Sequence, residues 1–153
     1  MRILFLGDVV GISGCSKIMN NLLEQIKINK IDFVIVNGEN AAEAGVGLTK
    51  EICEDFFNCG VNVITTGNHV WDQKEIMNYI DKENRLLRPK NLFEPAPGSG
   101  FEIFNIQNDV KIGVLNLMGN VFMKKCDDVF KIATEFIAQK KISKDYDFLI
   151  VDF

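Results

Sequence analysis

Three apolar runs of this sequence end in a glycine that is followed by residues with lone pairs on oxygen or nitrogen. They are G-D at 7–8, G-E-N at 38–40 and G-N-H at 67–69, and the last contains the chain's sole histidine. Carboxylate and amide oxygens with imidazole nitrogen are ligands for divalent cations such as Mn, Fe, Zn or Mg. The three segments therefore point to metal-assisted chemistry with a nearby proton donor.

Convergence of these residues depends on the runs being neighbouring parallel strands, because ligand sites lie outside the carboxyl ends of such strands. In that arrangement Asp8, Glu39, Asn68 and His69 meet in one crevice. Two carboxylates brought together repel each other unless a cation lies between them. The spacing thus predicts a divalent metal site, and an imidazole with an ordinary pKa of about 6.5 can exchange a proton near neutral pH.

Each of these residues also has a structural interpretation. A carboxylate after a strand is commonly a helix cap or a solvated loop residue, and a lone imidazole is commonly satisfied by the backbone. Asn40 and Asn68 could instead be turn residues in the left-handed conformation, an alternative that for Asn40 is nearly as good as ligation. Glu39 lies between Gly38 and Asn40 and does not precede an evident helix that it could cap, so a purely structural role is hardest to find for this residue.

The elements that would position these residues follow an alternating pattern of strands and helices. Short runs rich in Val, Ile and Phe alternate with segments of helical period, which is typical of an α/β fold with a largely parallel central sheet. Each run is apolar enough to be a strand buried on both faces. The runs span residues 2–8, 32–40, 61–68, 110–119 and 147–153.

Four segments have helical period. The first covers 16–29 and the second about 49–59, with Thr49 as the N-cap and Gly60 at the end. The third begins at Asp72, where D-Q-K-E resembles a capping box. The apolar face of the first helix is formed by Met19, Leu22, Leu23 and Ile26, and that of the fourth by Val129, Ile132, Ala133, Phe136 and Ile137.

The segment from 86 to 100 contains all three prolines and is predicted to be a long loop. The alternating run 101–107 is expected to pair with 110–119 as a hairpin across an Asn108-Asp109 turn. Since strands resume on both sides of the loop, residues 1–153 are interpreted as a single domain.

Composition limits the function classes. The chain has 153 residues and a formal net charge of −4, so a broad electrostatic footprint for duplex nucleic acid is not expected. No targeting segment and no apolar run of about 20 residues is present, which predicts a cytoplasmic protein without a membrane partner. Four cysteines, without CxxC spacing, are interpreted as small buried hydrophobes: Cys15, Cys53, Cys59 and Cys126.

The order of the three motifs resembles the calcineurin-like metallophosphoesterase superfamily. Within it, the chain is most similar to the YmdB-type branch of 2′,3′-cyclic nucleotide phosphodiesterases. That branch lacks the histidine that most members carry two residues after the first Asp, and Val10 occupies that place here. The matching motifs are G-D-V-V-G at 7–11, N-G-E-N-A-A at 37–42, G-x-G-x-T at 45–49 and T-G-N-H-x-W-D at 66–72.

The resemblance implies a layered αββα sandwich, here its N-terminal part, and a metal-dependent phosphodiesterase acting on small phosphodiesters such as 2′,3′-cyclic nucleotides. Two divalent ions, iron or manganese first and zinc or magnesium as alternatives, would supply the hydroxide nucleophile and clamp the phosphate. By position, Asp8, Glu39 and Asn40 would bind one ion, and Glu39 would bridge to a second that Asn68 also binds. His69 would be the proton donor.

Members of this branch take further ligands from histidines near and beyond a strand that matches 147–153, whereas this chain has no second histidine. We therefore expect a protein truncated at its carboxyl end, which need not be active alone; the alternative is an incomplete site. A catalytically silent metal- or nucleotide-binding regulatory module of the same fold is the competing hypothesis. A doubly wound nucleotide-cofactor domain is disfavoured because no G-x-G-x-x-G follows the first strand.

Overall fold

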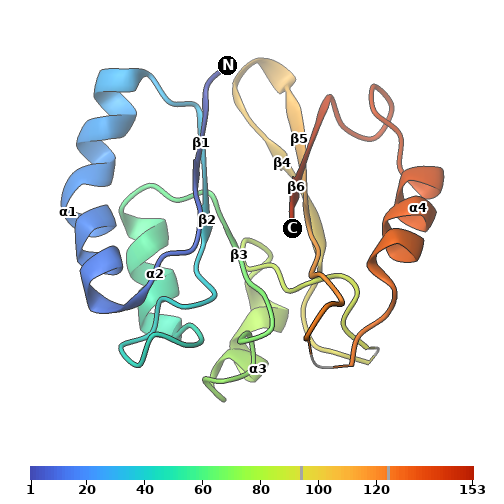
Figure 1. Ribbon diagram of the computed structural model, residues 1–153. Helices are drawn as coiled ribbons and strands as arrows, with labels where there is room; N and C mark the ends of the chain where they lie inside the picture. The colour runs from blue at the N-terminus through green and yellow to red at the C-terminus, as the bar shows by residue number, and fades with distance from the viewer. Residues whose placement is uncertain (94, 124) are drawn as a thin grey trace.

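Two three-stranded sheets face each other, and helices cover their outer sides (Figure 1). The structure, a computed structural model, describes residues 1–93, 95–123 and 125–153. Helices α1 and α2 lie outside the first sheet, and α4 lies outside the second (Figure 1). The layered α/β sandwich implied by the resemblance is confirmed, whereas the single central sheet expected from the strand pattern is wrong.

The first sheet is parallel with the order β1-β2-β3, formed by β1 (Ile3–Leu6), β2 (Phe33–Asn37) and β3 (Val63–Thr65). The central strand β2 is buried on both faces, because its first four residues are at most 1% exposed. The side chains alternate: Phe33 and Ile35 point between the sheets, while Val34 and Val36 point to the helices. The three strands therefore end at the same edge, as the sequence predicted.

The second sheet has the order β4-β5-β6, with β4 (Phe101–Asn105), β5 (Lys111–Asn116) and β6 (Phe148–Asp152). β4 and β5 form the predicted antiparallel hairpin, and β5 pairs with β6 in parallel. A short 3-10 segment, η2 (Gln107–Asp109), makes the turn with both Asn108 and Asp109 in the left-handed region.

Burial on both faces holds for β2 and β3 but not for every predicted strand. Phe5 on β1 is 41% exposed, and Phe148 and Val151 on β6 are 49% and 46% exposed. β1 and β6 are outer strands of their sheets, so apolar side chains there have neighbours on fewer sides. β3 is also an outer strand, but the segment at Leu86 bridges to Ile64 along its free edge. The sequence pattern alone did not distinguish central from outer strands.

The core consists of three clusters, one for each interface of the four layers. The cluster between the sheets contains Phe33, Ile35, Val63, Leu87, Ile112 and Val114. Side chains between the first sheet and its helices form a larger cluster that includes Val34, Val36, Ile64, Leu22, Cys53 and Phe56. The third cluster joins the second sheet to α4 through Leu115, Leu117, Val129, Phe136 and Tyr146.

Helix α1 (Gly11–Asn29) begins five residues before its predicted start. Its apolar stripe begins earlier than expected, because Cys15 and Ile18 are buried together with Leu22. Leu23, assigned to the buried face, is 50% exposed. Since the helix starts this early, the loop between the end of β1 and α1 is short.

Helix α2 (Lys50–Asn58) matches its prediction, and the Thr49 hydroxyl accepts a hydrogen bond from the Ile52 N–H at 3.2 Å. In α4 (Val129–Gln139), Val129 and Phe136 are buried, but Ile137 is 57% exposed and does not belong to the buried face.

The helix predicted to start at Asp72 is absent there. Residues 71–75 form turns, followed by the short helix α3 (Ile76–Tyr79) and the 3-10 segment η1 (Ile80–Lys82). The two capping-box carboxylates have other partners: Asp72 contacts His69, and Glu75 accepts the N–H of Lys50 at 2.7 Å. The predicted cap is therefore wrong, because a local contact to His69 engages Asp72 and a tertiary contact to Lys50 engages Glu75.

The long loop from 86 to 100 is irregular as predicted, with Glu94 outside the described residues. The buried guanidinium of Arg88 donates hydrogen bonds to the carbonyls of Pro89, Ala96 and Pro97 and so fastens the loop. No helix in the described ranges is long and apolar enough to cross a membrane. Among the cysteines, burial is confirmed for three, whereas Cys126 is only partly buried.

Candidate metal centre

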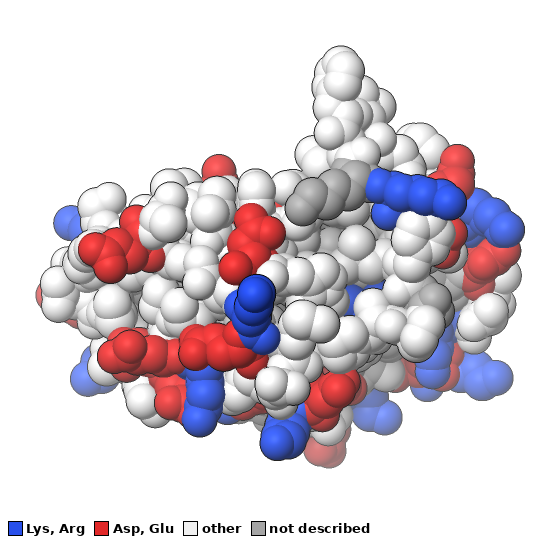
Figure 2. All heavy atoms as spheres, turned by 90° about the horizontal axis from the view of Figure 1, so that it is seen from below, with Lys and Arg blue, Asp and Glu red and all other residues white. Residues whose placement is uncertain are grey.

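The carboxyl ends of β1, β2 and β3 lie at the end of the molecule that is lowest in Figure 1. Figure 2 looks onto this end and shows several Asp and Glu side chains gathered over one part of the face. Excess negative charge at the end of a sheet favours cations over anions. An anionic substrate would therefore bind here more readily if cations were bound first.

Asp8 follows β1 and has an unusual backbone conformation, with φ of 44°. Non-glycine residues with positive φ are uncommon and cluster at functional sites, although Asp tolerates the conformation better than most. Its carboxylate is exposed, and Oδ1 accepts a hydrogen bond from Nδ2 of Asn40 at 2.7 Å. The Gly11 N–H donates to the Asn40 carbonyl at 2.9 Å, so backbone contacts also hold the two loops together.

Glu39 follows β2, and its carboxylate lies directly over Gly67 at the end of β3. A Cβ added at Gly67 would lie 2.0 Å from Oε2 of Glu39, so the side chain occupies space that only glycine leaves open. The other oxygen, Oε1, accepts the backbone N–H of His69 at 3.3 Å. Glu39 thus connects the second and third strand ends, as Asn40 connects the first and second.

Asn40 and Asn68 are not left-handed turn residues, since neither has positive φ. The side-chain amide of Asn40 is instead engaged with Asp8. Asn68 is partly buried and lines a cavity of about 230 Å³ together with Glu39 and Asp152. Asp8 and Asn40 do not line this cavity. The predicted ligands therefore form two adjacent groups, Asp8 with Asn40 and Glu39 with Asn68, which are connected through the Glu39-Asn40 peptide.

Asp152, at the end of β6, was not assigned to the site from the sequence. Its Oδ2 accepts a hydrogen bond from Nδ2 of Asn37 at 2.8 Å, which joins the second sheet to the first. Oδ1 of Asn37 in turn accepts the Glu39 N–H at 3.2 Å. The signal that could have identified Asp152 was its position, because it ends an apolar run as Asp8 does.

His69 is oriented by Asp72, three residues along the chain. The Nδ1–H donates to Oδ2 of Asp72 at 2.6 Å, and both side chains are about one-third exposed. With Nδ1 engaged in this way, Nε2 is the ring nitrogen available to a ligand. The structural alternative of an imidazole satisfied by backbone groups is therefore not what is observed.

The donors present fit a divalent cation. Two carboxylates, of Asp8 and Glu39, and two amides, of Asn40 and Asn68, provide the hard oxygen ligands that such ions prefer. Because Gly67 has no side chain, the Glu39 carboxylate can lie against the end of β3. Within the described residues, no group of three or more His, Cys, Asp and Glu side chains is placed to hold a metal ion. The amides are therefore essential to the ligand set that this chain offers.

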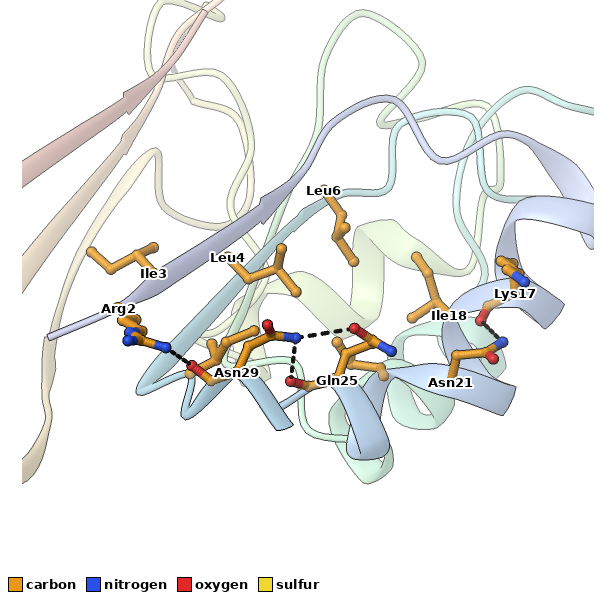
Figure 3. A pocket seen from close by; sticks show the side chains of 11 residues that line it. Arg2, Ile3, Leu4, Leu6, Lys17, Ile18, Asn21, Gln25 and Asn29 are labelled. Carbon is orange, nitrogen blue, oxygen red and sulfur yellow. Dashed lines mark hydrogen bonds between the residues drawn. The ribbon is translucent and has the colours of Figure 1, made fainter. Parts of the chain in front are cut away.

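A larger cavity, of about 700 Å³, lies elsewhere, between β1 and α1 (Figure 3). Its walls are aliphatic side chains such as Leu4, Leu6 and Ile18, and amides such as Asn21 and Gln25. The lining includes no carboxylate, thiol or imidazole, so we assign the chemistry to the smaller cavity despite the difference in size.

Comparison with known proteins identifies relatives along the whole chain. The chain is 40% identical over 153 residues to the 2′,3′-cyclic-nucleotide 2′-phosphodiesterase of Bacillus subtilis, covering 100% of this chain and 56% of the relative. It is 36% identical to a putative phosphatase/phosphodiesterase of Mycoplasma pneumoniae, covering 100% and 54%. The chain thus spans about half the length of the curated relatives it matches.

Solved structures share the fold. A novel phosphatase from Mycoplasma pneumoniae superposes with a TM-score of 0.88 at 37% identity, covering 100% of this chain and 54% of that one. A hypothetical protein from Thermus thermophilus gives a TM-score of 0.88 at 31% identity, covering 99% and 56%. The model of the YmdB-like protein family matches residues 4–153. This chain therefore belongs to the YmdB-like protein family.

Proposed function

We propose that this protein contributes the metal centre of a phosphodiesterase that hydrolyses small phosphodiesters such as 2′,3′-cyclic nucleotides. The observation that carries the proposal is the convergence of three strand ends, where Glu39 lies over Gly67 and beside the backbone of His69. The names of the relatives in Bacillus subtilis and Mycoplasma pneumoniae support phosphodiester substrates.

The residues that would hold two divalent cations, iron or manganese before zinc or magnesium, are Asp8, Glu39, Asn40 and Asn68. Such a pair, when bound, lowers the pKa of water and offsets charge on the phosphate oxygens. The carboxylates contribute two negative charges and the amides none, which leaves a loaded site electropositive toward an anion. The hydrogen bond from Asn40 orients the Asp8 carboxylate before any cation arrives.

In this proposal His69 protonates the leaving group. During hydrolysis a water oxygen bonds to phosphorus while the phosphorus–oxygen ester bond breaks, and the departing alkoxide needs a proton. Nε2 of His69 can donate it, because Nδ1 is held by Asp72 at 2.6 Å. Asp72 thereby fixes which ring nitrogen is available for the transfer.

The decisive experiment measures hydrolysis by protein loaded with Mn²⁺ or Fe²⁺, using a 2′,3′-cyclic nucleotide and bis-p-nitrophenyl phosphate. Asp8→Ala should abolish both reactions. His69→Ala should abolish cleavage of the nucleotide but reduce cleavage of the nitrophenyl ester less, since nitrophenolate leaves without a proton. Activity on the cyclic nucleotide that survives both substitutions would exclude the proposed mechanism.

A matched pair of neutral substitutions separates ligation from a general change of surface charge. Glu39→Gln removes a carboxylate at the site, and Glu24→Gln removes an exposed one from α1. Both substitutions change the net charge equally. If Glu39 is a metal ligand, only Glu39→Gln should weaken Mn²⁺ binding. Stoichiometric metal binding with no turnover of either substrate would instead identify the binding module of the same fold.

A further inference from the structure

A second cavity adjoins the candidate metal centre through two shared lining residues, Asn68 and Met118. It has a volume of about 230 Å³, and of the two shared residues Asn68 is a predicted metal ligand. Asp72, which holds the imidazole of His69, also lines the second cavity. A ligand in this space is therefore adjacent to both the predicted metal ligands and the predicted proton donor.

The lining of this second cavity combines aromatic rings with one cation. Trp71 and Phe93 provide rings, Met118 adds a flexible apolar surface, and Lys125 is the one Lys or Arg among the described lining residues. The ammonium of Lys125 lies over the Phe93 ring, 5.3 Å from its centroid. Flat apolar groups beside a positive charge are complementary to a heterocyclic base attached to a phosphate.

We propose that this cavity is the nucleotide-recognition subsite, in which Phe93 contacts the base and Lys125 attracts the phosphate-bearing part of the ligand. The inference rests on the proposed phosphodiesterase function and adds the substrate's orientation: base in the second cavity, phosphate toward Asn68. Lys125 offers the anion a positive charge on a chain whose formal net charge is −4.

Size and exposure favour a ligand subsite over a packing defect. Pockets for drug-sized ligands occupy about 300–1,000 Å³, so a space of about 230 Å³ suits a single ring system and excludes a folded dinucleotide. Trp71 packs partly against the core, but Phe93 is 43% exposed. An exposed aromatic ring beside a cavity retains a face for stacking, whereas a core ring does not.

Trp71 provides a direct readout, because it is the sole tryptophan of the chain and lines the cavity. Its fluorescence is recorded while the metal-free protein is titrated in chelator with adenosine 3′-monophosphate, ribose 5-phosphate or inorganic phosphate. We expect the nucleotide to change the emission saturably and the two ligands without a base to bind at least about ten times more weakly. Equal binding of all three would show an anion site and overturn the assignment of a base.

Substitutions then locate the contact. Phe93→Ala should weaken nucleotide binding about five-fold or more, since loss of one aromatic–base stack costs about 1–3 kcal/mol. Lys125→Met keeps the length of the side chain and should weaken binding of the nucleotide by a similar factor, while leaving affinity for uncharged adenosine unchanged. Phe130→Ala and Lys131→Met, which alter exposed side chains at the start of α4, are the matched controls.

The outcomes separate this inference from the function on which it rests. If the controls and both site variants bind the nucleotide equally, the base lies elsewhere and the subsite assignment is wrong. If nucleotides leave Trp71 emission unchanged while the metal-loaded protein still hydrolyses bis-p-nitrophenyl phosphate, the inference fails and the phosphodiesterase proposal survives. Circular dichroism of each variant establishes that a loss of binding is not a loss of fold.

Discussion

Gly67→Ala tests whether the position of the Glu39 carboxylate matters for cation binding. The added methyl carbon would lie 2.0 Å from Oε2, 2.3 Å from Cδ and 2.6 Å from Oε1 of Glu39. Real Cβ atoms essentially never approach other atoms within 3.0 Å, so the carboxylate has to retreat by about 1 Å. The backbone itself tolerates alanine, because Gly67 is not in the left-handed region.

A displacement of this size is large for a metal ligand, whose distances are held within about 0.2 Å. Loss of a residue that merely supports a ligand costs about 10–100-fold in metal affinity. We therefore expect Gly67→Ala to weaken Mn²⁺ binding by about 100-fold. Glu39 is only partly buried and can turn toward solvent, so the free energy of unfolding should change by no more than about 1 kcal/mol.

Isothermal titration with Mn²⁺ measures the affinity, and chemical denaturation measures the stability. Gly7→Ala is the matched control, because a Cβ there meets only Phe5 Cε1 at an ordinary 3.6 Å. The double variant Gly67→Ala/Glu39→Ala should bind no more weakly than Glu39→Ala alone, since both changes act through one carboxylate. Unchanged affinity in Gly67→Ala, or full additivity in the double variant, would refute Glu39 as a ligand in this position.

Three other predictions concern particular contacts and side chains. Asp72→Asn should lower kcat for a 2′,3′-cyclic nucleotide about 100-fold but lower kcat for bis-p-nitrophenyl phosphate less, because Asp72 orients the proton donor His69. Equal losses of kcat on both substrates would contradict this role. Iodoacetamide should modify Cys126 well before the three buried cysteines, because burial raises the pKa of their thiols; peptide mass spectrometry gives the order. Hydrogen bonds from Arg85 lower the pKa of Glu83. They therefore stabilise the folded protein above the ordinary Glu pKa of about 4.3, and this stabilisation is lost as the pH falls through the lowered pKa. Urea unfolding should accordingly show that the parent has a larger free energy of unfolding than Glu83→Gln, and that this difference shrinks as the pH is lowered below about 5.

Local sequence rules identified the strand ends because burial and turn chemistry act over a few residues. Asp8 and Glu39 each follow an apolar run through a glycine, and the parallel order β1-β2-β3 brings those ends to one edge. The same rules located the hairpin turn at Asn108-Asp109, where both residues adopt positive φ. These features required no knowledge of how the two sheets pack.

The errors occurred where spacing along one segment did not reveal which other groups a side chain meets. Asp72 and Glu75 have the spacing of a capping box, but the imidazole of His69 and the backbone N–H of Lys50 take these two carboxylates instead. Similarly, Ile137 has the spacing of a buried residue, yet the second sheet covers only part of α4 and leaves it exposed. Spacing along one helix describes which residues share a face but not how much of that face another element covers.

The contribution of β6 to the site could not be predicted from β6 itself. Its last residue, Asp152, reaches the first sheet only because the two sheets stack with their strand ends level, which permits the 2.8 Å hydrogen bond to Asn37. Asn37 then positions the backbone of Glu39 through its other side-chain atom, at 3.2 Å. The conformation of a predicted ligand in one sheet is thereby coupled to the end of a strand in the other, so the site is a property of the stacked pair of sheets and not of the three parallel strands alone.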